Sequence, residues 1–306
     1  MDVFLNGKMV PFDQATISVH DAGFQHALGL FETMAVHHGQ VFRLDEHLAR
    51  LAHSAATLGL ARELHIAPLA QAVRQTVTHN QLQLARVRLT LTAGDVSLLK
   101  PAAGAAPPPQ PTLLIVATPP TEYDPGYFEQ GITVLIAPAG ANPFDALAGH
   151  KTLSYWARLR TLRQAAAAGA GEAIWLNVTN HLASGAVSNV FLVRDGTLLT
   201  PIARGQEAAG ALPAPVLPGV TRAAIIELAA ALGLPVEKRM LSIDDLLDAD
   251  EVFLTNSSWN VLPVTRVEKK AIGDGAVGPV TRRLREALLE LIKRETSGER
   301  KVENRM

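Results

Sequence analysis

The sequence predicts an α+β protein with a smaller α+β N-terminal domain and a larger, strand-rich mixed α/β C-terminal domain. Three observations support this fold class. The chain has 306 residues, more than one hydrophobic core usually organises. Its first part opens with short strand patterns and continues into amphipathic helices. Its second part alternates apolar strand runs with helical patterns, which is typical of a mixed sheet flanked by helices.

The N-terminal domain begins with two hairpin patterns. Residues 3–10 form an apolar run broken by Asn6-Gly7, a pair that favours a two-residue turn because both residues tolerate positive φ. A second apolar run from Gly29 to Val36 leads through a short polar turn to residues 41–42. We therefore expect strands at the start of the fold.

Two helices and a strand pair complete the predicted domain. Apolar residues recur at helical spacing over residues 44–60, and a second helix is predicted over 66–79. Residues 86–92 alternate polar and apolar side chains, the pattern of a half-buried strand. We expect this strand to pair with residues 112–118.

Proline-rich segments set the predicted domain boundaries. Residues 101–111 are rich in proline and alanine and are expected to form a mobile surface loop. The N-terminal domain is assigned to residues 1–118 and an interdomain linker to 119–131. The C-terminal domain follows over 132–293, and the polar tail 294–306 is expected to fray.

Strands and helices alternate along the predicted C-terminal domain. The strands are expected at 132–137, 173–178, 190–194 and 252–255, and the helices at 152–168, 220–232, 242–247 and 279–293.

Composition excludes several classes of function. The 28 Lys and Arg residues balance 29 Asp and Glu residues, so there is no basic footprint for nucleic acid or for a membrane surface. There are no cysteines, which excludes thiolate metal sites, and the histidines of the first quarter lack metal-ligand spacing. With no signal-peptide pattern at the N-terminus, we expect a cytoplasmic protein that binds a small molecule and no metal.

Lys151 is the first candidate for chemistry. It lies in the run from Gly149 to Tyr155, after a glycine and a histidine and before a predicted helix. A lysine amine held there could form a Schiff base with an aldehyde cofactor. Most lysines are only solvated surface residues, so the assignment depends on the other candidates.

Three further motifs could bind a phosphate. Val220 and Thr221 start a predicted helix after a proline-rich loop, and helix N-termini attract phosphate. A threonine there is also a common helix cap. Ser257 follows an apolar strand and could lie in an ordinary polar turn. Arg50 lies late in the first long helix, where a guanidinium could bind phosphate bidentately or could simply be solvated.

These residues belong to a set of motifs that occur in order from about residue 3 to residue 290. The set resembles that of the class IV aminotransferases, the fold-type IV group of pyridoxal-phosphate enzymes. This family includes branched-chain aminotransferases, D-amino acid transaminases and 4-amino-4-deoxychorismate lyases. The matching segments are 29–33, 42–51, Lys151, 188–191, 218–222 and 254–257.

The resemblance implies pyridoxal 5'-phosphate as cofactor, an amino-acid substrate and a homodimer. It implies that Lys151 forms the Schiff base and acts as the catalytic base. Tyr155 would lie near the phenolic oxygen of the cofactor, although it could equally be a helix-packing residue. The residues implied to bind the cofactor phosphate are Arg50, Val220, Thr221 and Ser257.

The resemblance leaves the reaction open. Phe31 and Thr33 match the lyases, in which a threonine close to the cofactor assists proton transfer. Arg88 matches a substrate-pocket arginine of some members and fits both lyases and branched-chain aminotransferases. Ala93 stands where D-amino acid transaminases have a carboxylate-binding arginine, which argues against D-amino acids. The lyase reaction, which releases pyruvate and 4-aminobenzoate for folate synthesis, is favoured over branched-chain transamination.

Ser184 is the main departure from the family pattern. The family has a glutamate at this cofactor-binding position, where it pairs with the pyridine nitrogen of the cofactor and keeps it protonated. A neutral hydroxyl cannot stabilise a pyridinium in this way. Three explanations remain open. The chemistry is tuned to need a weaker electron sink, another carboxylate replaces the missing one, or catalysis has been lost and cofactor binding kept.

Overall fold

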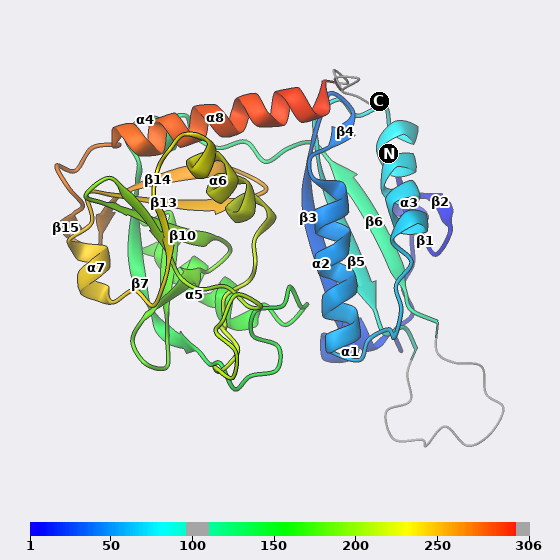
Figure 1. The fold of residues 1–306 in the computed structure, drawn as a ribbon. Coiled ribbons are helices and arrows are strands. Elements are labelled where there is room, and N and C mark those ends of the chain that lie inside the picture. Colours follow the sequence, from blue (N-terminus) through cyan, green and yellow to red (C-terminus); the bar gives the residue numbers. More distant parts are fainter. Residues whose placement is uncertain (96–109, 298–306) are drawn as a thin grey trace, which may run out of the picture. The chain divides into compact units, whose positions relative to one another are not determined.

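The computed structural model describes residues 1–95 and 110–297, which form two compact units (Figure 1). The first unit contains residues 1–121, 150–154 and the segment from Lys293 onward, and the second contains residues 122–149 and 155–292. Nearly all of the predicted loop 101–111, and most of the predicted tail 294–306, lie outside the described residues.

The first unit is built on an antiparallel sheet. Its strand order is β2-β1-β6-β5-β3-β4. The predicted hairpin turn is present, with Asn6 at φ 47° and Gly7 at φ 91°. The expected pairing of the strands at 86–92 and 112–118 is also confirmed. The strands are β1 (Asp2–Leu5), β2 (Lys8–Pro11), β3 (Gly29–His37), β4 (Gln40–Val41), β5 (Ala85–Thr92) and β6 (Leu113–Thr118).

Helices α2 (Leu44–Thr57) and α3 (Ile66–His79) cover one face of this sheet (Figure 1). Their apolar stripes meet the alternate side chains of the strands in a single core that includes Met34, Leu48 and Val73. Because successive strand residues point to opposite faces, the residues between the core positions of β3 and β5 lie on the other face. The short helices η1 (Phe12–Gln14) and α1 (Ala22–His26) were not predicted.

Residues 150–154 join this unit by pairing with β3. The amide of Phe31 donates to the Lys151 carbonyl, and the amide of Leu153 donates to the Gly29 carbonyl. The predicted helix over 152–168 is therefore wrong at its start, and α5 (Trp156–Ala167) begins four residues later. The reason is that β3 binds the backbone groups that a helix beginning at Thr152 would need.

The second unit contains a nine-stranded mixed sheet. Its strand order is β12-β11-β10-β13-β14-β7-β8-β9, and β15 also pairs with β14. The strands are β7 (Ile132–Ala141), β8 (Glu172–Asn177), β9 (Leu182–Gly185), β10 (Asn189–Arg194), β11 (Thr197–Thr200), β12 (Val236–Lys238), β13 (Glu251–Asn256), β14 (Asn260–Val267) and β15 (Lys270–Ala271).

The helices of the second part of the chain match the predicted positions more closely than the strands do. The predicted helices are α5, α6 (Val220–Ala231), α7 (Ile243–Leu247) and α8 (Pro279–Thr296), whereas α4 (Gly126–Glu129) lies in the predicted linker and was not predicted. Five strands, β9, β11, β12, β14 and β15, were not predicted. Within residues 1–95 and 110–297, no helix is both long and apolar enough to cross a bilayer.

Candidate active site

Lys151 lies against Phe31 on the first unit. Its Nζ is 4.4 Å from the centre of the Phe31 ring, within the range of a cation–π contact. The turn before it contains Gly149, whose φ of 77° is in the left-handed region that favours glycine. The backbone hydrogen bonds to β3 hold the lysine in place beside the strand.

Arg88 contacts the same ring. Its guanidinium carbon is 3.8 Å from the centre of Phe31, and Arg88 on β5 stands directly opposite Thr33 on β3. Residues opposite each other in an antiparallel pair share a face of the sheet, and Phe31 shares that face because it is two residues from Thr33. The structure thus brings together the four residues predicted for catalysis and substrate binding in the first unit.

A buried ion pair fixes Arg50 in the same unit. Arg50 Nε donates to Glu32 Oε1 at 2.8 Å, and Arg50 Nη2 donates to Glu32 Oε2 at 2.5 Å. His47 Nδ1 lies 2.8 Å from Glu32 Oε2. Glu32 and His47 were not predicted as site residues. The sequence could have indicated His47, because His47 and Arg50 are three residues apart and lie on one helical face.

The pKa shifts define the charges of this cluster. Burial alone would raise the pKa of Glu32, but the Arg50 charge and the His47 hydrogen bond hold it at about 2. Burial lowers the pKa of His47, and the nearby Arg50 and Lys151 charges lower it further, against the opposing effect of Glu32. At neutral pH the cluster therefore holds a charged carboxylate, a charged guanidinium and a neutral imidazole.

The second unit presents an uncapped helix N-terminus. Gly219 is the N-cap of α6 and supplies no side-chain cap. Thr221, considered above as a possible cap, is instead the second residue of the helix and is buried. The first-turn amides of a helix have no intrahelical acceptor, so those of Val220 and Thr221 suit an anion.

Asn189 brings the start of α6 next to the end of β13. It pairs across the sheet with Thr255, and its Nδ2 donates to the Leu217 carbonyl at 2.9 Å. A Cβ on Gly219 would lie 2.0 Å from Asn189 Oδ1, so a larger residue there would displace the Asn189 side chain. The predicted residue Ser257 comes directly after β13.

The donor set at this end of the sheet fits a phosphate. The Thr255 hydroxyl is buried and has no hydrogen-bond partner among the described residues. Thr255 lies on the same face as Asn189 because the two are a cross-strand pair. Hydroxyls and helix amides are the donors that phosphate oxygens require, so these residues fit the predicted phosphate group of the cofactor.

Ser184 lies buried on β9, opposite Trp175 of β8. Arg158 of α5 donates from Nη1 to Ser184 Oγ at 3.2 Å and to the carbonyls of Gly185 and Ala186, each at 3.1 Å. Its guanidinium carbon is 5.0 Å from the centre of the Trp175 ring. Arg158 was not predicted, and no sequence pattern links position 158 to position 184.

Glu172 is the carboxylate that binds the loop after Ser184. Its Oε1 accepts from the amides of Ala173 and Ala186, and its Oε2 accepts from the Val187 amide and the Ser188 hydroxyl. Burial raises the pKa of Glu172, while these hydrogen bonds oppose the rise. Within the described residues, the charged group that contacts Ser184 is a guanidinium and not a substitute carboxylate.

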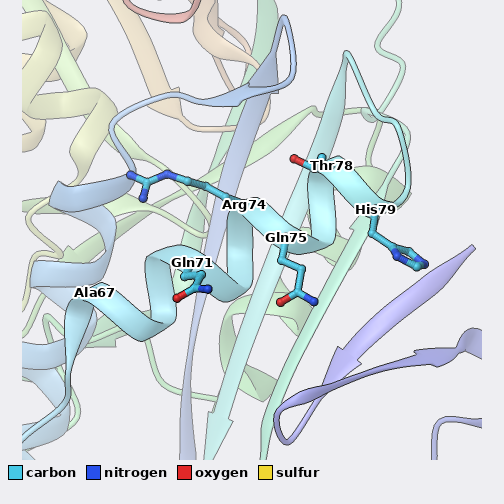
Figure 2. A pocket seen from close by; sticks show the side chains of 6 residues that line it. All are labelled: Ala67, Gln71, Arg74, Gln75, Thr78 and His79. Atoms are coloured by element: carbon cyan, nitrogen blue, oxygen red, sulfur yellow. The ribbon is translucent and has the colours of Figure 1, made fainter.

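Tyr155 and two other features of the described residues add little to the candidate site. Tyr155 is the half-buried N-cap residue of α5. A surface hollow along α3 (Figure 2) contains none of the predicted site residues and is lined by Ala67, Gln71, Arg74, Gln75, Thr78 and His79. In the part of the chain that the structure describes, no cluster of three or more His, Asp or Glu side chains could hold a metal ion.

Known proteins share both the sequence and the fold. The family model for amino-transferase class IV matches residues 29–267. The branched-chain-amino-acid aminotransferase of Salmonella typhimurium is 33% identical over 306 residues, covering 96% of this chain and 94% of the relative.

Two solved structures show the same similarity. The branched-chain amino acid aminotransferase of Escherichia coli superposes with a TM-score of 0.86 at 30% identity, covering 98% of this chain and 97% of the other. The 4-amino-4-deoxychorismate lyase of Pseudomonas aeruginosa has a TM-score of 0.80 at 30% identity, covering 94% and 98%.

The chain belongs to the class IV aminotransferase family. It is therefore an enzyme with the two-domain α+β architecture of fold-type IV. Members of this family use pyridoxal 5'-phosphate as cofactor.

Proposed function

We propose that this enzyme binds pyridoxal 5'-phosphate through Lys151 and releases pyruvate and 4-aminobenzoate from 4-amino-4-deoxychorismate. The observation that carries the proposal is the grouping of Lys151, Phe31, Thr33 and Arg88 on the first unit. A lysine amine, a hydroxyl and a guanidinium are the groups that such a reaction needs for proton transfer and for carboxylate binding.

The cofactor-binding residues follow from the donor sets described above. The α6 amides of Val220 and Thr221, together with the Ser257 hydroxyl, would bind the phosphate. Arg50 would also bind the phosphate, with its guanidinium oriented by Glu32. Ser184 would face the pyridine ring, and Tyr155 would lie near its phenolic oxygen.

When bound, the cofactor would supply an electron-withdrawing imine to the substrate amine, which takes the place of Lys151 Nζ and so frees that amine to act as a base. The imine would acidify the carbon bearing the substrate amine. Lys151 Nζ removes the proton from that carbon. The electron pair left behind expels the enolpyruvyl oxygen from the neighbouring carbon, and the ring becomes aromatic. Enolpyruvate then takes up a proton and becomes pyruvate. Lys151 Nζ would displace the 4-aminobenzoate amine from the cofactor, so that atoms and electrons balance without an oxidant. The Thr33 hydroxyl would assist the proton transfer, and Arg88 would hold a substrate carboxylate.

Branched-chain amino acid transamination is the second candidate. It is supported by the 33% identity to the Salmonella typhimurium aminotransferase along nearly the whole chain. Arg88 suits the carboxylate of either substrate. Thr33 favours the lyase because it matches the threonine of those enzymes. Ser184 favours the lyase because elimination carries the electron pair away on the leaving group, whereas transamination requires the cofactor ring to hold that pair.

A product assay on the purified holoenzyme tests the proposal. With 4-amino-4-deoxychorismate we expect equal amounts of pyruvate and 4-aminobenzoate and a much slower amine transfer from leucine, isoleucine or valine to a keto acid. Borohydride reduction followed by peptide mapping should place the cofactor on Lys151. Fast keto-acid-dependent transfer without pyruvate would support the second candidate, and protein that binds no cofactor would exclude both.

The homodimeric state and the cytoplasmic location stay predictions. Trp156 is 81% exposed in the single chain, as an interface residue of a dimer would be. Light scattering of the purified protein would determine whether it is a dimer.

A further inference from the structure

We propose that Arg158 is a positioning residue that turns the Ser184 hydroxyl into a hydrogen-bond donor toward the cofactor ring nitrogen, which therefore stays unprotonated. This inference rests on the proposed function, because it takes Ser184 as the residue that faces the pyridine ring. It goes further by naming the group that acts on Ser184 and the protonation state that results.

The direction of the hydrogen bond follows from the chemistry of the two side chains. A guanidinium has donors only, whereas a hydroxyl has one donor and two acceptor lone pairs. The bond from Arg158 Nη1 to Ser184 Oγ therefore uses an acceptor lone pair of the hydroxyl. The hydroxyl hydrogen is then available for an acceptor such as a neutral pyridine nitrogen. The remaining lone pair could accept from a pyridinium, but the positive charge of Arg158 disfavours that alternative.

Arg158 is held in this arrangement from several sides. Its Nη1 also donates to the carbonyls of Gly185 and Ala186, and its guanidinium lies over the Trp175 ring. The Trp175 indole donates to the Thr161 hydroxyl at 3.0 Å, and that hydroxyl donates to the Arg158 carbonyl at 2.9 Å. Both the backbone and the side chain of Arg158 are thus tied to the strands that hold Ser184.

The charges around Ser184 act in the same direction. No ion pair joins Arg158 to a carboxylate within the described residues, so its charge is not neutralised by one. Glu172, the acid bound to the adjacent loop, already accepts four hydrogen bonds from Ala173, Ala186, Val187 and Ser188. A positive charge next to a titratable nitrogen disfavours its protonation, so the environment opposes a pyridinium.

The first measurement is the nitrogen-15 chemical shift of the cofactor ring in the holoenzyme, using pyridoxal 5'-phosphate labelled at that nitrogen. We expect the shift of an unprotonated pyridine at neutral pH. A pyridinium shift in a holoenzyme whose cofactor maps to Lys151 would overturn this inference while leaving the proposed function intact. Protein that binds no labelled cofactor would instead overturn the proposed function, and this inference with it.

The second measurement isolates the role of Arg158. It compares the affinities for pyridoxal 5'-phosphate and for its deaza analogue, in which a CH group replaces the ring nitrogen. The wild type should bind the natural cofactor about tenfold more tightly, the worth of one well-placed hydrogen bond. Ser184→Ala should abolish this preference, Arg158→Met should reduce it to about twofold or less, and Arg158→Lys should restore part of it.

A matched control separates positioning from a structural role. Arg160 is an exposed arginine on the same helix, and Arg160→Met should leave the preference at its wild-type value. If Arg158→Met weakened both cofactors equally and left their ratio unchanged, Arg158 would be only a structural residue and the inference would fail.

Discussion

The two arginines Arg50 and Arg158 have opposite electrostatic settings. Arg50 is paired with the buried carboxylate of Glu32, so its cluster holds one negative and one positive charge. Arg158 donates to a hydroxyl and two carbonyls, so its positive charge is retained beside Ser184. Under the proposed function, the protein keeps an acid where it orients a phosphate-binding arginine and lacks one where an acid would protonate the cofactor ring.

Removal of Lys151 should have the largest effect. Under the proposed function, Lys151→Ala removes both the covalent attachment and the catalytic base, and a positioned base contributes about 10²–10⁴-fold to a rate. We expect kcat to fall by at least about that factor and the visible absorption band of the bound cofactor to disappear. Lys8→Ala, at an exposed lysine of β2, is the control and should leave both unchanged. A Lys151→Ala enzyme of normal activity would exclude Lys151 as the base.

Loss of the Glu32 carboxylate should lower the free energy of unfolding. Glu32→Gln leaves the mostly buried Arg50 guanidinium without its carboxylate, and breaking a buried pair costs about 3–5 kcal/mol in other proteins. Urea denaturation should show this loss in the free energy of unfolding. Glu63→Gln, at an exposed carboxylate, should change it by less than about 0.5 kcal/mol. Equal stability of the two variants would show that the ion pair contributes nothing.

The same cluster should make the protein sensitive to acid. The pKa of Glu32 is lower in the folded state than in the unfolded state, so its stabilisation is present above the unfolded pKa of 4.5 and is lost as the pH falls toward about 2. The pKa of His47 is also lowered, so stability begins to fall once the pH drops below 6.5. Unfolding free energies measured from pH 7 to pH 3 should decline in the wild type, and constant values over this range would contradict these two pKa shifts.

Loss of the Asn189 side chain should weaken cofactor binding, because Asn189 holds the start of α6. Asn189→Ala removes the hydrogen bond to the Leu217 carbonyl that holds the start of α6, and such a loss at a buried site costs about 1–3 kcal/mol. We expect weaker binding of pyridoxal 5'-phosphate, by about tenfold, measured by equilibrium titration. Unchanged affinity in a folded variant would show that the start of α6 is positioned without Asn189.

Thr33 should have one of the smaller effects, similar in size to that of Asn189. Thr33→Val removes one hydroxyl while keeping the shape of the side chain, so the rate of pyruvate release should fall by about tenfold. Thr33→Ser keeps the hydroxyl and should retain most of the activity. A serine variant as slow as the valine variant would assign Thr33 to packing.

The parts that sequence patterns predicted are those set by local periodicity. The helix over 66–79 matches α3 exactly, and the alternation in β5 placed Arg88 on the face opposite the core. Lys151, Val220 and Ser257 were selected as candidates because each follows a turn or begins or ends an element. The helix start at residue 152 was wrong because a non-local pairing with β3 overrides the local pattern.

The contacts that sequence patterns missed form between residues that are far apart in the sequence. Arg158 meets Ser184 only because α5 packs against the sheet that contains β8 and β9, and β9 is a four-residue strand too short to show alternation. Glu172 and Asn189 each bind loops remote in sequence from their own strands. Such partners become visible only in three dimensions.

The most direct test of the central claim is the ratio of amine transfer to pyruvate release in the wild type and in the double variant Ser184→Glu, Arg158→Met. The variant supplies the missing acid and removes the opposing charge, so its ring nitrogen should be protonated. We expect the wild type to release pyruvate with little amine transfer, and the double variant to show a ratio raised by about tenfold or more. An unchanged ratio, or a wild type that is inactive until the acid is restored, would contradict the claim that the arginine and serine tune an active enzyme toward elimination.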